Sequence, residues 1–113
     1  MTKKYADEEV FRRDGFKCVY CGFDGRQFKG WAFLVVDHFK PKRLDQDGDT
    51  HELENLKTAC CICNAMKGGS QSKDVAEARE RLKLMSDQMQ GYWEKNVLPL
   101  IPPEDTQRGA ISI

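Results

Sequence analysis

Five cysteines constrain this 113-residue chain more than any other feature. Cys18 and Cys21 form one Cys-x-x-Cys pair, and Cys60 and Cys63 form a second pair much later in the chain. Four thiolates spaced in this way can close a tetrahedral zinc site, which would tie two distant segments together. The sequence therefore predicts one structural zinc ion (Zn²⁺) per chain, with no open position for a substrate.

The second pair leaves a choice of ligands, because Cys61 lies between Cys60 and Cys63. Cys61 and Cys63 are separated by one residue and would point to opposite sides of an extended strand. We therefore assign Cys60 and Cys63 as ligands and expect Cys61 to be free and buried. Unmetallated thiols are the alternative, although a reducing compartment favours metal binding over disulfides.

The rest of the composition is that of an ordinary globular domain, with 40% hydrophobic and 32% charged residues. No apolar run approaches the ~20 residues that span a bilayer, and the first residues lack the apolar core of a signal peptide. We expect one intracellular, cytoplasmic domain over residues 1–113, with no role at a membrane.

The charge distribution is uneven, although the net charge is zero. Residues 1–43 hold ten Lys or Arg and six Asp or Glu, a net of +4, and the remainder hold eight against twelve, a net of −4. Lys40, Lys42 and Arg43 form a local basic cluster. Such a cluster can meet phosphates, while a solvated surface explains any one of these residues equally well.

Apolar and punctuating residues predict a small α+β core. We expect a helix over residues 7–14, a strand over 31–36, a loop over 41–50 and a second strand over 55–59. A short helix should begin around residues 61–64 and end near Lys67, before two glycines. The two cysteine pairs would then lie at the corners of this core.

A longer helix is predicted over residues 73–94, with Ser72 as its N-cap. One apolar stripe of this helix is expected to pack on the core. Its members are Val75, Ala78, Leu82, Met85 and Met89. Prolines then end regular structure, so residues 99–113 are expected to form a loose tail.

Two polar residues follow the first predicted strand, Asp37 and His38. Neighbours in a strand face opposite sides, so they can divide duties between a metal and a substrate. Zinc would hold Asn64 near the same strand end, and carboxylate and amide oxygens suit a hard cation such as Mg²⁺. An Asp-His dipeptide alone is weak evidence, and the bracketing cysteine pairs strengthen it.

Three segments together resemble an HNH endonuclease (a His-Me finger nuclease) of the zinc-bound, four-cysteine kind. They read RDGFKCVYCG over residues 13–22, VDHFKP over 36–41 and NLKTACCICNAMKG over 55–68. The resemblance covers about residues 8–69, with the segments in the family's order and spacing. It implies a ββα-metal core with a four-cysteine zinc site, flanked by an N-terminal and a C-terminal helix.

The resemblance also implies residue roles. His38 matches the general base, Asp37 matches a ligand of the catalytic metal, and Asn55 matches the residue that holds the loop carrying the base through hydrogen bonds. Asn64 matches the last motif residue, often a histidine and a metal ligand. Lys67 matches a basic residue that touches phosphate in many members, although a plain surface lysine explains it better.

The implied activity is hydrolysis of DNA phosphodiester bonds. Neutral His38 would take a proton from water, and one divalent ion, Mg²⁺ or Mn²⁺, would stabilise the phosphate and the leaving 3′ oxygen. DNA contacts are expected from Lys40, Lys42, Arg43 and Lys67. The 73–94 helix is a candidate surface for clamping DNA, for a homodimer or for a larger nuclease complex.

Two other functional classes compete with this interpretation. A non-catalytic zinc module that binds nucleic acid or protein needs neither the Asp37-His38 dipeptide nor Asn64. A thiol-exchange protein needs only one Cys-x-x-Cys pair with an accessible thiolate. His51 matches no motif position, so we expect a loop residue there, with a third metal ligand as the less favoured alternative.

Overall fold

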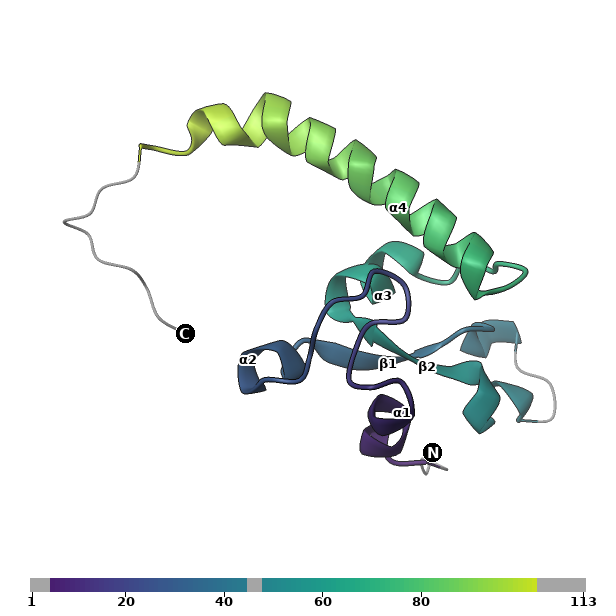
Figure 1. Ribbon diagram of the computed structural model, residues 1–113. Coiled ribbons are helices and arrows are strands. Elements are labelled where there is room, and N and C mark those ends of the chain that lie inside the picture. Colours follow the sequence, from purple (N-terminus) through teal and green to yellow (C-terminus); the bar gives the residue numbers. More distant parts are fainter. Residues whose placement is uncertain (1–4, 45–47, 104–113) are drawn as a thin grey trace.

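The core is a two-stranded antiparallel sheet with helices on both sides (Figure 1). A computed structural model describes residues 5–44 and 48–103. Strand β1 spans Leu34–His38 and β2 spans Leu56–Cys60, and in their register Leu34 lies opposite Cys60. This is the small α+β fold with flanking helices that the sequence predicts.

Helix α1 (Asp7–Arg13) packs on the sheet through Val10 and Phe11, which are both buried. Polar contacts fix its end to β2. The Asp14 carboxylate accepts a hydrogen bond from the Thr58 N–H at 2.9 Å, and the Thr58 hydroxyl donates to the Val10 carbonyl at 3.2 Å. The helix predicted over residues 7–14 is confirmed, and it is fixed to the sheet through β2.

The strand predicted over residues 31–36 begins later than expected. A single helical turn, α2 (Phe28–Trp31), comes first, and β1 then continues through His38. Gly30 permits this turn, because a Cβ atom there would lie 2.5 Å from the Asp24 carbonyl oxygen. Trp31 is therefore exposed on a turn and does not enter the sheet.

Helix α3 (Cys61–Lys67) starts directly after β2 and lies on the opposite side of the sheet from α1 (Figure 1). The Cys60 sulfur caps it by accepting a hydrogen bond from the Cys63 N–H at 3.4 Å. Gly68 ends it with a positive φ of 53°, a conformation that glycine adopts readily. The short helix expected after the second strand is confirmed.

The segment between the strands contains three short 3₁₀ turns. They span Lys42–Leu44, Asp49–His51 and Leu53–Asn55. The predicted loop over residues 41–50 therefore contains short 3₁₀ turns but no α-helix or strand in its described residues. Residues 45–47 lie outside the described part of the chain.

Helix α4 (Val75–Tyr92) is capped by Asp74 and not by Ser72, which corrects the prediction. The Asp74 carboxylate accepts a hydrogen bond from the Glu77 N–H at 2.9 Å. Ser72 is buried, and its hydroxyl accepts a hydrogen bond from Arg81. Ser72 therefore holds the segment that leads into α4, and it lies two residues before the N-cap residue.

Only the first half of α4 packs on the core. Ala78 and Leu82 are buried, whereas Met85 is 38% exposed and Met89 is 55% exposed. Figure 1 shows the second half leaving the core as an arm. The predicted apolar stripe therefore continues along the whole of α4, but only its first half is buried by the core. The second half stays exposed because α3 does not extend that far along α4.

Regular structure continues past the expected end of this helix. A π-helical turn (Trp93–Val97) and a 3₁₀ turn (Leu98–Leu100) follow α4 directly. The loose tail predicted over residues 99–113 therefore begins later, and its residues 104–113 lie outside the described part of the chain. Of the helices within residues 5–44 and 48–103, none is long and apolar enough to cross a membrane.

Candidate functional site

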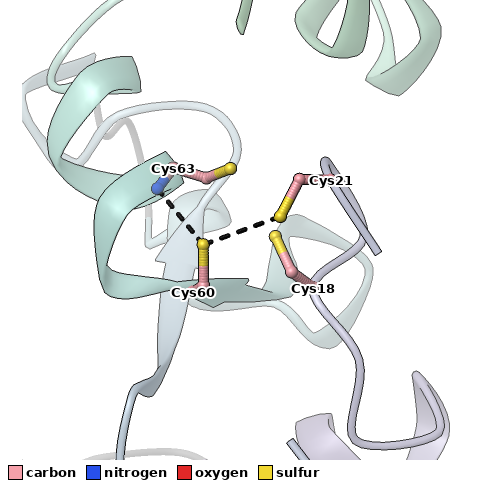
Figure 2. Close-up of side chains that lie close together, drawn as sticks. All are labelled: Cys18, Cys21, Cys60 and Cys63. Atoms are coloured by element: carbon pink, nitrogen blue, oxygen red, sulfur yellow. Dashed lines mark hydrogen bonds between the residues drawn. The ribbon is translucent and has the colours of Figure 1, made fainter. Parts of the chain in front are cut away.

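Four cysteine sulfurs converge where the loop after α1 meets the junction of β2 and α3 (Figure 2). The sulfurs of Cys18, Cys21, Cys60 and Cys63 all lie within 4.8 Å of one another. Cys21 and Cys60 have their sulfurs 3.7 Å apart, close to the ~3.8 Å edge of a tetrahedron with Zn–S bonds of about 2.3 Å. The predicted ligand set is therefore assembled and fits zinc.

Electrostatics explain why these thiols favour a metal. A hydrogen bond from Cys63 is the main cause that lowers the Cys18 pKa, to about 4. The same interaction raises the Cys63 pKa, and burial raises the pKa of Cys21 to about 11. Four thiols this close cannot all ionise unless a cation neutralises them, which is what Zn²⁺ would supply.

Cys61 is exposed, which corrects the expectation that it is buried. It is the first residue of α3, and the chain turns there so that Cys60 and Cys63 face the cluster while Cys61 faces solvent. Its absence from the sulfur cluster agrees with the predicted choice of ligands.

His38 ends strand β1 and is partly buried. Its ring packs edge-to-face against that of His51, with centroids 5.3 Å apart. Burial is the main cause that lowers the His38 pKa, and the nearby charges of Lys42 and His51 add to it. The lowered pKa favours the neutral form of His38, which is the state that a general base requires.

Asn55 holds the chain segment that follows His38. Its side-chain oxygen accepts a hydrogen bond from the Lys40 N–H at 2.8 Å, and its amide donates to the carbonyls of Lys40 and Thr50. The Phe39 N–H also donates to the Asn55 carbonyl. The hydrogen bonding predicted for Asn55 is observed, and its part in catalysis stays a prediction.

Asp37 faces the interior of the protein and is 4% exposed. One carboxylate oxygen accepts a hydrogen bond from the Tyr20 hydroxyl at 2.5 Å. The Lys67 ammonium lies 3.4 Å from the carboxylate. Burial and the bond to Asp37 raise the Tyr20 pKa, so that its hydroxyl stays protonated and donates.

Lys67 is not a surface lysine, which corrects both expectations for this position. It is 3% exposed, and its ammonium donates to the His38 carbonyl at 3.2 Å and lies 5.6 Å from the centre of the Phe39 ring. Helix α3 directs this side chain toward the end of β1, where Asp37 supplies a counter-charge. In this conformation Lys67 does not reach a phosphate in solvent.

The other three predicted basic contacts are nearer to solvent. Lys42 is exposed, Lys40 forms an ion pair with Asp49 at 2.6 Å, and Arg43 donates to the Gly69 carbonyl at 2.7 Å. All three residues belong to the segment that directly follows His38 in the chain.

The family comparison agrees with this arrangement. The family model described as HNH endonuclease matches residues 18–70. This segment is an HNH domain. Such domains are typical of nucleases that act on DNA, and His38 lies inside the matched segment.

The chain resembles a curated protein, the Type 4 apparatus protein DotN of Legionella pneumophila. The two are 35% identical over 60 residues, which is 53% of this chain and 23% of DotN. The chain thus spans less than a quarter of that relative's length. No solved structure matches this chain.

The two donors that the sequence predicts for a catalytic metal lie on different elements, Asp37 on β1 and Asn64 on α3. Asp37 and Asn64 have the right chemistry for a hard cation, and Asn64 lies one helical turn before Lys67 on α3. The Asp37 carboxylate is already neutralised by Lys67 and enclosed by Tyr20. A divalent ion would have to displace the Lys67 ammonium in order to bind Asp37.

Sequence reasoning missed two contacts of the HNH site. Tyr20, between the first two cysteines, bonds Asp37, and His51 packs against His38. The position of a tyrosine between two cysteines does not predict that its hydroxyl will bind a carboxylate far away in the sequence. The presence of a second histidine in the loop was visible, but its contact with His38 depends on how that loop folds.

Proposed function

We propose that this chain is an endonuclease that hydrolyses DNA phosphodiester bonds, with His38 as the general base. The observation that carries the proposal is the place of His38 at the end of β1, beside the chain segment that Asn55 holds, inside a segment that matches the HNH family. A neutral imidazole at this place can accept a proton at physiological pH.

In the proposed reaction, the His38 imidazole takes a proton from a water molecule, whose oxygen then attacks phosphorus. The bond between phosphorus and the 3′ oxygen breaks, and the departing 3′ oxygen takes a proton from solvent. General-base help of this kind is worth about 10²–10⁴ in rate. Asn55 keeps the base in place by fixing the chain at Lys40.

A divalent ion, Mg²⁺ or Mn²⁺, held by Asp37 and Asn64 would neutralise charge on the phosphate and on the leaving oxygen. We propose these two side chains as its ligands because both are oxygen donors, with Asp37 beside His38 on β1 and Asn64 on α3, the helix whose Lys67 already reaches Asp37. The four cysteines would hold the structural zinc.

Lys42 is the proposed principal contact to DNA phosphate, because it is exposed and its charge is felt at His38. Lys40 and Arg43 are proposed to add weaker contacts to DNA phosphate, through those of their N–H groups that do not bind Asp49 or the Gly69 carbonyl. Such contacts give affinity that falls with added salt.

A cleavage assay on supercoiled plasmid, with branched DNA alongside and with Mg²⁺ or Mn²⁺, tests the proposal. The wild type should nick or cut, and a folded His38→Ala protein with normal zinc content should lose ~10² or more in rate. That variant, purified in the same way, also controls for contaminating nucleases. Full activity in His38→Ala would exclude the mechanism.

The enclosure of Asp37 favours a second candidate, a non-catalytic zinc module that binds nucleic acid or protein. The partial similarity to an apparatus protein agrees with it. Such a module would keep the zinc and the fold and would cut no DNA with any divalent ion. The same assay therefore separates the two candidates.

We further propose that the free half of α4 joins two copies of this chain. Met85, Met89 and Tyr92 continue the stripe of the buried Ala78 and Leu82 at steps of three and four residues. Such spacing lets two helices pack along a shared apolar seam. A second copy offers the same uncovered stripe.

A further inference from the structure

Four aromatic side chains are exposed on residues 23–33, which we call the α2 lobe. Their exposed fractions are 78% for Phe28, 54% for Phe33, 42% for Trp31 and 37% for Phe23. The rings of Phe28 and Trp31 are stacked with centroids 6.2 Å apart, and Phe23 meets Phe33 edge-to-face at 6.5 Å. Clustered exposed aromatics mark a binding surface more often than scattered ones do.

The α2 lobe also contains a groove of about 340 Å³. Its lining combines two aromatic rings with polar groups. The lining residues are Phe23, Asp24, Gln27, Lys29, Gly30 and Phe33. Flat apolar faces next to amide and carboxylate groups suit a planar ligand that has hydrogen-bonding edges.

The charge around the α2 lobe is positive. Residues 15–36 contain Lys17, Arg26 and Lys29 but only one acid, Asp24. Arg26 neutralises that acid through an ion pair at 2.8 Å. Lys17 is brought to the lobe by a backbone bridge with Asp24. The surface therefore suits a partner that carries negative charge together with flat rings.

We propose that the α2 lobe binds the unpaired bases of single-stranded or branched DNA. Bases stack on aromatic faces without sequence preference, while Lys17 and Lys29 meet the phosphates. Paired bases inside a duplex do not offer their faces for such stacking. The inference rests on the proposed function for its choice of DNA, and it deepens that function by naming the class of DNA.

The position of the α2 lobe agrees with this role. Helix α2 lies near the Leu34 end of β1, and His38 ends the same strand (Figure 1). Four steps of about 3.3 Å separate those two residues, or ~13 Å. A single strand held on the lobe would bring a junction with duplex DNA toward the candidate base.

Binding is best measured without cleavage, on the His38→Ala protein with no added divalent metal. The chain has two tryptophans, so Trp93→Phe leaves Trp31 as the only one. Titration with a thymidine oligonucleotide of ~15 nucleotides should quench Trp31 fluorescence, because bases that stack on the lobe contact its rings. We expect affinity at least ~10-fold above that for duplex of equal length.

Phe28→Ala should weaken single-strand binding ~10-fold, because it removes the most exposed ring while leaving the core untouched. Leu100→Ala is the matched control, since Leu100 is 79% exposed on the 3₁₀ turn that follows α4 and lies outside the proposed dimer stripe, and it should leave binding unchanged. Lys29→Ala should weaken binding and reduce its dependence on salt.

Absence of single-strand binding, equal affinity for duplex, or unchanged binding in Phe28→Ala would each overturn the proposal. Self-association that Phe28→Ala abolishes, without DNA binding, would assign the lobe to protein contact instead. Cleavage of duplex DNA by the wild type without single-strand binding would remove this inference alone. Single-strand binding without any cleavage would remove the nuclease proposal and leave the lobe as a DNA-binding surface.

Discussion

Asp37 and Lys67 show how neighbours decide the role of a residue. Both are charged, and both are almost fully buried, where an isolated charge is costly. Each is tolerated because the other lies 3.4 Å away and because Tyr20 and the His38 carbonyl provide further hydrogen bonds. A metal that binds Asp37 has to compete with this ion pair.

Lys67→Met is expected to destabilise the protein by about 3–5 kcal/mol, because it leaves the Asp37 charge buried and unpaired. If Asp37 accepts a divalent ion, Mn²⁺ should recover part of that loss. Denaturant unfolding with and without Mn²⁺, at constant zinc content, measures both effects. Lys83→Met is the matched control, since the exposed pair with Asp87 contributes about 0–1 kcal/mol.

Recovery by Mn²⁺ in Lys67→Met but not in Lys67→Met/Asp37→Asn would place the ion at Asp37. A Mn²⁺ response that is the same in both proteins would show that Asp37 does not bind this ion.

The lowered pKa of His38 predicts the pH dependence of cleavage. A general base works in its neutral form, and the neutral fraction falls as pH drops through the pKa. Because that pKa lies below the ordinary value of about 6.5, the rate should be flat from about pH 7 upward and decline only in more acidic buffer. Initial rates across pH, at saturating Mg²⁺, test this. A decline that begins above neutral pH would contradict the assigned direction.

At the scale of elements, the junction of β2 and α3 organises the molecule. Cys60 ends the strand, caps the helix and faces the sulfur cluster, while Cys63 lies one helical turn further on. The loop with Cys18 and Cys21 reaches this junction from the other end of the HNH segment. Zinc at the cluster would therefore fix three elements at one point.

Metal content should report that arrangement directly. We expect about one zinc per chain, and a strong chelator should unfold the protein, because a core this small depends on the cross-link. Cys61→Ser should keep zinc and stability, since Cys61 is exposed outside the cluster. Cys60→Ser should lose both. Elemental analysis and circular dichroism provide the readouts, and the reverse pattern would show that the ligand choice is wrong.

At the scale of the whole molecule, α4 divides into a packed half and a free half. An 18-residue helix is about 27 Å long, and only its first turns reach α3 and the sulfur-bearing core. Large apolar residues continue along the arm, including Tyr92, Trp93 and Leu98, which are all more than 40% exposed. An isolated chain leaves this surface in water.

Sedimentation analysis should show a dimer if two arms pair. Met89→Glu is expected to give a monomer, because it places a charge in the proposed seam. Its zinc content and unfolding should stay as in the wild type, since Met89 is already 55% exposed within one chain. Gln88→Glu, which adds the same charge beside the stripe, is the control. A monomeric wild type would remove the dimer proposal.

The sequence by itself determined the features that depend on local spacing. These features are the two cysteine pairs, the helix that begins at the second pair and the strand that leads to His38. Each is a short-range pattern that predicts one local structure. The hydrogen bonds of Asn55 followed from the family motif and are present. The fold class follows from the same local order of strand, strand and helix.

Only the tertiary structure decided which side chains are enclosed. Lys67 and Tyr20 meet at Asp37 from segments far apart in sequence, and Phe28 and Trp31 are exposed because Gly30 lets the chain wind before β1. Half of the α4 stripe is uncovered because the core ends there. Periodicity reports the face that a helix can bury, whereas burial itself requires a neighbouring element within reach.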